Sequence, residues 1–204
     1  MSETKIFIPV ADFKIEGLID ESPGDGAVVI THPHPLYGGD MHNPVVHSIV
    51  SAYQQKGYTT LRINFRGVGQ SGGTHADGIG EQDDVRAALG YLYDLGKTAI
   101  DLAGYSFGAR VNAMGLENYE QAKRLIMVSP PVAVMDFSFL GHNAKIELVI
   151  TGSNDDIAPP ATIQAQLSTW NPKATFKVID NIDHFYSRGT SEVTEIIKTF
   201  LEND

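Results

Sequence analysis

One serine of the chain has the surroundings that a nucleophile needs. Ser106 lies in Gly104-Tyr-Ser-Phe-Gly108, which fits the pattern G-x-S-x-G. In this pattern the serine stands on a strained turn from a strand to a helix, so that its hydroxyl projects above the sheet. The two glycines remove Cβ atoms that would collide in such a turn. We predict that Ser106 is a nucleophile, because the alternative role of a helix N-cap does not require flanking glycines.

A second segment, Gly69-Gln-Ser-Gly-Gly73, fits the same pattern around Ser71. Its context differs, because two glycines and a threonine follow Ser71 and cannot open a helix at once. Ser106 instead follows a short apolar run at 99–103 and precedes a good helix start at 107–116. The context therefore favours Ser106 over Ser71.

A serine hydroxyl is a poor nucleophile without a base, and the base needs an orienting acid. On a strand–helix turn of this kind the acid and then the histidine follow the serine along the chain. Two histidines follow Ser106: His142 precedes a predicted strand, whereas His184 lies between the last predicted strand and the last predicted helix. A loop at that place can carry an imidazole over the sheet, so we predict that His184 is the base.

The acid is expected in the loop after the strand at 146–151. That loop contains Asp155 and Asp156, and neighbours along a chain seldom point the same way. We predict that Asp155 orients His184, with Asp156 as the alternative. Asp180 and Asp183 are weaker candidates, because both fit turn positions at which an aspartate bonds to its own backbone.

The elements that must position these residues alternate between strands and helices. Strands are expected at 5–10, 14–20, 27–31, 59–65, 99–103, 124–128, 146–151 and 175–179. Helices are expected at 44–56, 81–95, 107–116, after 160 and at 192–201. This alternation predicts a mostly parallel sheet with helices on both faces, whose active site lies in loops beyond the carboxyl ends of the strands.

Composition narrows the function classes. The chain has 204 residues, 42% of them hydrophobic and 20% charged, which predicts one soluble globular domain over residues 1–204. A formal net charge of −10 disfavours nucleic acid and anionic membranes as partners. The sequence has no signal-peptide pattern and no apolar run long enough to span a membrane, and it has no cysteine. We expect a cytoplasmic protein without disulfides or thiolate metal sites.

Five segments together resemble the α/β-hydrolase superfamily. Three of them, 104–108, 152–159 and 183–185, resemble its nucleophile, acid and histidine segments. Two others, His32-Pro-His-Pro-Leu-Tyr-Gly-Gly39 and 64–72, resemble small bacterial serine hydrolases that carry an HPHP loop and lack a cap domain. The resemblance implies esterase-like activity and selects Asp155, the third residue after the glycine. Ala158 departs from the branched residue that is common there, without affecting Asp155.

The gap in which a cap domain is usually inserted, 129–145, is too short for one. We therefore expect an open site that takes small or flexible substrates. The expected reaction is cleavage of a small carboxylic ester, or of a thioester, through an acyl-enzyme, and no cofactor is implied. Phe137 is expected to line an acyl pocket, together with Met135, Phe139 and Leu140. The alternative, that these side chains plug the edge of the sheet, is about as well supported.

Acyl transfer also needs N–H donors for the oxyanion. One is expected at Phe107, directly after the nucleophile and at a helix N-terminus. The second is expected in the HPHP loop, whose prolines have no N–H. The resemblance favours Leu36, followed by Tyr37. His34 and Tyr37 are further expected to touch substrate, although His32 and His34 could instead simply bond to backbone.

Other functions are weaker interpretations of the same residues. His32 and His34 could bind a metal, but no further ligand follows at a suitable spacing, so no metal is expected. The run Gly67–Gly72 fits G-x-G-x-x-G, which would indicate dinucleotide binding, but no helix opens directly after it. A catalytically silent binding protein on the same fold is the third alternative.

Overall fold

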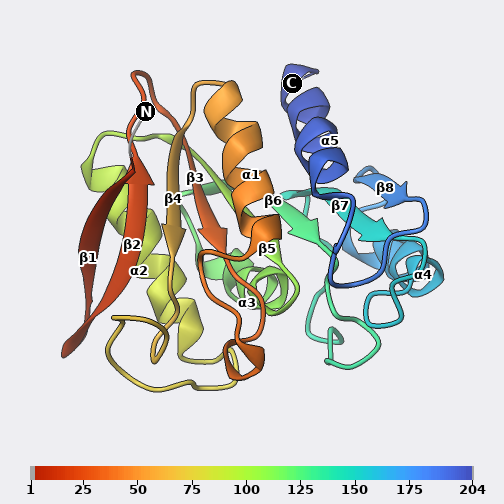
Figure 1. The fold of residues 1–204 in the computed structure, drawn as a ribbon, viewed down its shortest axis with the longest axis horizontal. Helices are drawn as coiled ribbons and strands as arrows, with labels where there is room; N and C mark the ends of the chain where they lie inside the picture. The colour runs from red at the N-terminus through yellow and green to blue at the C-terminus, as the bar shows by residue number, and fades with distance from the viewer. Residues whose placement is uncertain (1–2, 204) are drawn as a thin grey trace.

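The computed structural model describes residues 3–203 and contains an eight-stranded sheet in the order β1-β2-β4-β3-β5-β6-β7-β8 (Figure 1). The strands are β1 (Thr4–Val10), β2 (Phe13–Asp20), β3 (Gly26–Thr31), β4 (Thr59–Ile63), β5 (Ala99–Tyr105), β6 (Ala122–Val128), β7 (Ile146–Gly152) and β8 (Thr175–Ile179). β2 pairs antiparallel with β1 and β4, and the remaining pairs are parallel.

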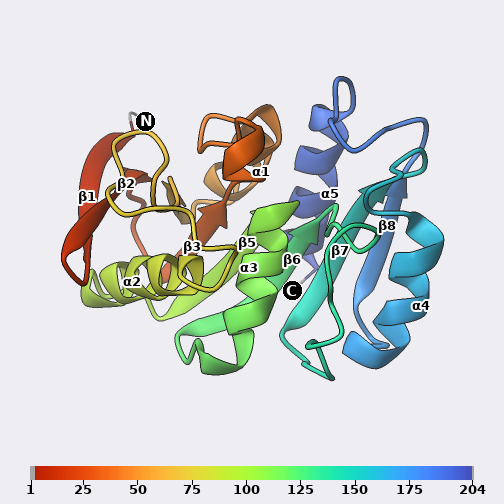
Figure 2. The same ribbon diagram turned by 90° about the horizontal axis from the view of Figure 1, so that it is seen from below.

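Helices cover both faces of the sheet. They are α1 (Pro44–Gln55), α2 (Glu81–Asp94), α3 (Phe107–Gly115), α4 (Pro160–Trp170) and α5 (Thr190–Glu202), with short 3₁₀ helices η1 (Pro35–Tyr37) and η2 (Leu116–Asn118). α1 and α5 lie on one face, and α2, α3 and α4 lie on the other (Figure 2). Each face has its own apolar core, as expected for a parallel sheet buried on both sides.

The carboxyl ends of the parallel strands β3 to β8 meet at one edge, here called the carboxyl edge. The segments that follow these strands gather there, and 32–43 and 64–80 are seen at the bottom of Figure 1. The prediction of a mostly parallel sheet covered on both faces is confirmed. The predicted elements agree with the observed ones to within a few residues, except that η1 and η2 were not predicted. No helix in residues 3–203 is long and apolar enough to cross a membrane.

A buried salt bridge connects the neighbouring strands β5 and β6. Asp101 on β5 is 1% exposed, and its Oδ1 accepts a hydrogen bond of 2.8 Å from Nε of Arg124 on β6. Its Oδ2 accepts the hydroxyl of Tyr53 on α1 at 2.9 Å. Burial raises the pKa of Asp101 to about 6, against the opposing effect of Arg124. The network thus joins two strands and one helix below the carboxyl edge.

Replacing Asp101 with Asn should lower the free energy of unfolding by roughly 3 kcal/mol, because it removes the charged partner from the buried salt bridge to Arg124. Urea unfolding followed by circular dichroism measures the change. Asp94→Asn, at an exposed position, is the control and should stay within about 0.5 kcal/mol of the parent. Equal midpoints for the two variants would contradict this account of the network.

Candidate active site

Ser106 lies on a sharp turn between β5 and α3. Its backbone has φ 54° and ψ −118°, a region that side-chain-bearing residues rarely adopt. A Cβ added at Gly104 would lie 2.6 Å from the Ala109 nitrogen, and one added at Gly108 would lie 2.5 Å from Oγ1 of Thr31. The turn therefore requires glycine at both flanking positions, as the sequence pattern predicts.

The structure brings the three predicted side chains together in the predicted order. Ser106 Oγ lies 2.9 Å from Nε2 of His184, although 78 residues separate them along the chain. Nδ1 of His184 lies 2.9 Å from both carboxylate oxygens of Asp155. Because a carboxylate only accepts, Nδ1 carries the proton, and in the neutral imidazole the Nε2 lone pair faces the serine hydroxyl.

Asp155 is buried, and His184 together with nearby backbone N–H groups keeps it ionised. Burial raises the pKa of its carboxyl, but the hydrogen bond and charge of His184 and the N–H of Ala158 outweigh it, so that the net pKa is lowered. The N–H groups of Ile157 and Ala158 donate to Oδ1 at 3.0 and 2.7 Å. Thr151 Oγ1 donates to the Ala158 carbonyl at 2.7 Å and so fixes this turn. The carboxylate is thereby aimed at His184.

Two loops are joined so that the imidazole reaches the serine. Asn154 N–H donates to the carbonyl of Ile182 at 2.9 Å, and Ser153 N–H donates to that of Ile179 at 2.8 Å. A Cβ at Gly152 would lie 2.1 Å from the Ile182 carbonyl oxygen, so this close approach also requires glycine. The loop that carries Asp155 therefore holds the loop that carries His184.

Sequence reasoning missed the buried tyrosines under these loops. The hydroxyl of Tyr105 donates to the backbone carbonyl of His184 at 2.5 Å. The hydroxyls of Tyr186 and Ser129 lie 2.8 Å apart. Tyr105 stands directly before Ser106 and Tyr186 two residues after His184, but nothing in the residue types signals these partners.

The remaining candidates for the acid and the base lie elsewhere. Asp156 is exposed and lacks the N–H bonds that hold Asp155. Asp183 Oδ1 accepts the N–H of Phe185 at 3.1 Å. This bond to nearby backbone is the alternative role that the sequence predicts for Asp183. Asp180 is exposed at the end of β8, and His142 is exposed in the loop before β7.

The HPHP loop uses most of its own N–H groups. Those of Tyr37 and Gly39 donate to the His34 carbonyl at 3.1 and 3.0 Å, and that of Gly38 donates to the Pro35 carbonyl at 3.1 Å. The Leu36 N–H donates to Nδ1 of His34 at 3.3 Å, the longest bond of the set. To serve as an oxyanion donor, the Leu36 N–H would have to give up its bond to His34. The oxyanion-hole roles of Leu36 and Phe107 remain predictions.

His32 and His34 have different surroundings. His32 is fully buried, its Nδ1 donates to the Pro33 carbonyl at 2.7 Å, and its Nε2 accepts the Phe65 N–H at 3.1 Å. Burial lowers the pKa of His32 to about 4, so the ring stays neutral. The His34 ring lies 4.8 Å from that of Phe107, next to the nucleophile. Among the described residues 3–203, no group of three or more side chains is arranged to hold a metal.

The glycine run 67–72 folds back onto β2. Ser71 Oγ accepts the N–H of Glu16 and donates to the Asn64 carbonyl, both at 2.8 Å, so this second serine bonds only to backbone. Gly72 N–H donates to the Lys14 carbonyl. α2 begins only at Glu81, so no helix N-terminus follows the run as dinucleotide binding would require.

Phe137 belongs to the apolar core on the face covered by α2, α3 and α4. It is 4% exposed, and its ring lies 5.4 Å from that of Trp170. Phe137, Leu140 and Met135 line a cavity of about 360 Å³ between the 129–142 segment and α4, of which Ser106 is not part. Phe139 is partly exposed and stacks on Phe137. A substrate contact by Phe137 remains a prediction.

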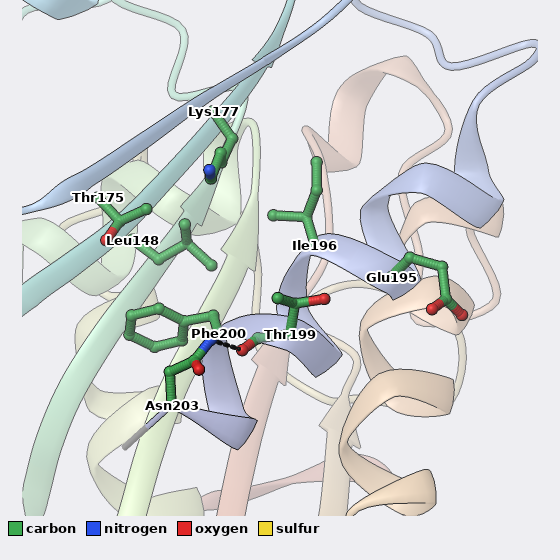
Figure 3. Close-up of a pocket in the computed structure, with 8 residues that line it drawn as sticks. All are labelled: Leu148, Thr175, Lys177, Glu195, Ile196, Thr199, Phe200 and Asn203. Atoms are coloured by element: carbon green, nitrogen blue, oxygen red, sulfur yellow. Dashed lines mark hydrogen bonds between the residues drawn. The ribbon is translucent and has the colours of Figure 1, made fainter.

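A larger cavity, of about 600 Å³, lies between α5 and strands β7 and β8 (Figure 3). Leu148, Ile196 and Phe200 form its apolar part, and Lys177 and Glu195 are its charged residues. None of the predicted site residues lines it.

Comparison with known proteins identifies the superfamily to which the chain belongs. No protein-family profile matches the chain. It is 32% identical to the uncharacterized protein RP471 of Rickettsia prowazekii, over 97% of this chain and 88% of that protein. It is 31% identical to an alpha-beta serine hydrolase homologue from Coxiella burnetii, with a TM-score of 0.89 and 98% of both chains covered. The chain belongs to the α/β-hydrolase superfamily.

A third comparison concerns the cap. This α/β hydrolase is 29% identical to XC6422 of Xanthomonas campestris, a serine hydrolase described as having no lid, with a TM-score of 0.90 over 100% of this chain and 95% of that one. The segment between β6 and β7 accordingly contains no helix or strand in the structure. The expected α/β-hydrolase fold without a cap domain is confirmed, and these relatives support hydrolase function.

Replacing Gly104 with Ala should lower the free energy of unfolding by about 2 kcal/mol or more, because the added methyl would lie against the α3 backbone. Gly90→Ala is the matched control: Gly90 lies inside α2, a Cβ there meets nothing within 4 Å, and alanine should stabilise the helix by about 0.5–1 kcal/mol. Thermal unfolding of both variants checks the pair, and a Gly104→Ala variant as stable as the parent would contradict the argument.

Proposed function

We propose that this α/β hydrolase cleaves small carboxylic esters or thioesters through an acyl-enzyme, with Ser106, His184 and Asp155 as its catalytic triad. The observation that carries the proposal is the unbroken hydrogen-bonded chain from Ser106 Oγ through His184 to Asp155, on a turn that holds the hydroxyl at the carboxyl edge. A cofactor has no part in this chemistry, and the partner is a small-molecule ester.

In the acylation step, Ser106 Oγ attacks the carbonyl carbon while its proton passes to Nε2 of His184. The imidazolium is stabilised by the ionised Asp155. Collapse of the tetrahedral intermediate breaks the bond to the leaving alcohol or thiol, which takes the proton from Nε2. The acyl group is then bonded to Ser106.

Deacylation repeats these steps with water. His184 removes a proton from a water molecule, which attacks the acyl carbon, and Ser106 leaves with that proton as the carboxylic acid is released. During both steps the oxyanion needs N–H donors. The Phe107 N–H at the start of α3 is one proposed donor, and that of Leu36 is the other, released from His34.

The burial of the three side chains fits this role. Ser106 and His184 are each 7% exposed, and Asp155 is 2% exposed. The small exposed fractions of Ser106 and His184 leave a substrate carbonyl an approach, while the carboxylate stays out of water, where its attraction for the imidazolium is stronger.

Ser106→Ala should reduce hydrolysis of a p-nitrophenyl acyl ester by about 10⁴-fold or more, because no nucleophile remains. The release of p-nitrophenolate measures the rate, and the thermal unfolding of the variant is the control for folding. Turnover that persists in the folded variant would overturn the proposed role. A fluorophosphonate probe should label the parent at Ser106, and a parent that resists labelling would favour a silent scaffold.

Asp155→Asn should reduce kcat by roughly 10⁴-fold, because an amide can hold His184 in the wrong tautomer. Asp156→Asn is the matched control one residue away: this side chain is exposed, and the change should alter kcat for a neutral ester by less than about threefold. Similar losses in the two variants would contradict the choice of Asp155.

A further inference from the structure

The carboxyl edge carries the most exposed apolar side chains of the described residues. They are Leu36, Tyr37, Ile79, Val134 and Phe185, with exposed fractions of 70, 88, 71, 67 and 72%. All five lie in segments that follow parallel strands: η1 after β3, the segment between β4 and α2, and the loops after β6 and β8. We call these five side chains the apolar rim.

The apolar rim is placed around the proposed nucleophile. Leu36 and Tyr37 belong to the loop whose His34 ring lies 4.8 Å from that of Phe107, the residue after Ser106. Phe185 directly follows His184, and the two rings lie 5.9 Å apart. A substrate with its carbonyl at Ser106 would therefore have apolar surface on more than one side.

Acidic side chains outnumber basic ones on the segments that carry the apolar rim, with five exposed aspartates against one exposed arginine, Arg188. Exposed aspartates on the same segments are Asp77, Asp136, Asp156, Asp180 and Asp183. The segments 32–43, 64–80, 129–142, 153–159 and 180–189 contain no lysine, and their arginines are Arg66 and Arg188. Arg66 is already bound by the carboxylate of Asp84, through its Nε and Nη2.

Phosphate groups are recognised mainly by arginine, lysine and helix N-termini. At this edge the α3 N-terminus is assigned to the oxyanion, and the exposed carboxylates repel anions over about a Debye length of 10 Å at 0.1 M salt. A leaving group that carries several phosphates would thus meet net repulsion, with Arg188 as the one exposed lysine or arginine on these segments.

We propose that the site is selective for acyl groups with an apolar chain on uncharged leaving groups, and that it discriminates against acyl groups carried on phosphate-bearing thiols. This inference rests on the proposed acyl-transfer function and narrows its substrate class. For both kinds of leaving group the steps are the same. Ser106 takes the acyl group, the alcohol or thiol leaves with the proton from His184, and water then releases the carboxylic acid.

The decisive experiment compares two thioesters of the same acid. Hexanoyl N-acetylcysteamine and hexanoyl coenzyme A share the bond that breaks and the atoms next to it, but only the second carries phosphates. A thiol-reactive dye follows the release of both, and the chain has no cysteine to react with it. At about 0.02 M salt we expect kcat/KM to be at least tenfold higher for the uncharged thioester, with the ratio falling as salt rises to about 0.5 M.

Variants test whether the exposed carboxylates cause the preference. Asp77→Asn/Asp156→Asn should lower the ratio of the two kcat/KM values at least threefold. Asp94→Asn/Glu120→Gln removes the same two charges from exposed positions near the opposite edge and should leave the ratio unchanged. If the ratio fell equally in both variants, the preference would come from the net charge of the whole protein. That result would overturn the assignment to the carboxylates at the carboxyl edge.

A second comparison tests the apolar rim. Hexanoyl N-acetylcysteamine should have at least tenfold higher kcat/KM than acetyl N-acetylcysteamine, and Leu36→Ser/Ile79→Ser should reduce this advantage. Equal, Ser106-dependent hydrolysis of all three thioesters would overturn the inference and leave the proposed function standing. Absence of any Ser106-dependent hydrolysis of these thioesters and of p-nitrophenyl esters would overturn the proposed function itself.

Discussion

The site depends on one backbone constraint, the positive φ of Ser106 between β5 and α3. That conformation is unfavourable by about 1–3 kcal/mol for a residue with a side chain, so the rest of the fold must impose it. β5 is central in the sheet and paired on both sides, and the Ser106 N–H is held by the Val128 carbonyl at 2.9 Å. Gly104 and Gly108 then let α3 start against Thr31 of β3. The hydroxyl is fixed because its turn has no room to relax.

The site also requires that the loop after β8 hold the His184 imidazole next to Ser106, with its proton on Nδ1. The loops after β7 and β8 are joined by backbone bonds at Ser153 and Asn154, and the Tyr105 hydroxyl supports the carbonyl of His184. Asp155 is itself held by two backbone N–H groups, so its position does not depend on His184 alone. Proton transfer between Oγ and Nε2 therefore requires little rearrangement, which is the advantage of a preorganised site.

Much of this arrangement could be predicted because it is local in the chain. The alternation of apolar runs and amphipathic segments defines the sheet, and the order serine, aspartate, histidine follows the order of its strands. The contributions of Tyr105, Tyr186 and Thr151 could not be predicted, because each depends on loops that meet only in three dimensions. The same holds for Leu36, whose N–H donates to an imidazole that also contacts the ring of Phe107. The expected acyl-pocket role of Phe137 rested on its apolar character, which serves the core equally well.

The short connection between β6 and β7 has a consequence for selectivity. Phe137 and Leu140 turn inward and join the core, whereas Val134 remains on the surface. In the structure of residues 3–203, this connection supplies no helix that could form a cap over the proposed nucleophile. Discrimination between substrates must then come from the side chains around an open site, which act through apolar contact and through charge. Such contacts are individually weak, so in the proposed function the chemistry depends on the Ser106–His184–Asp155 chain while recognition is spread over several loops. This division explains how a small α/β hydrolase can hold its reacting groups within hydrogen-bond distance and still leave them accessible.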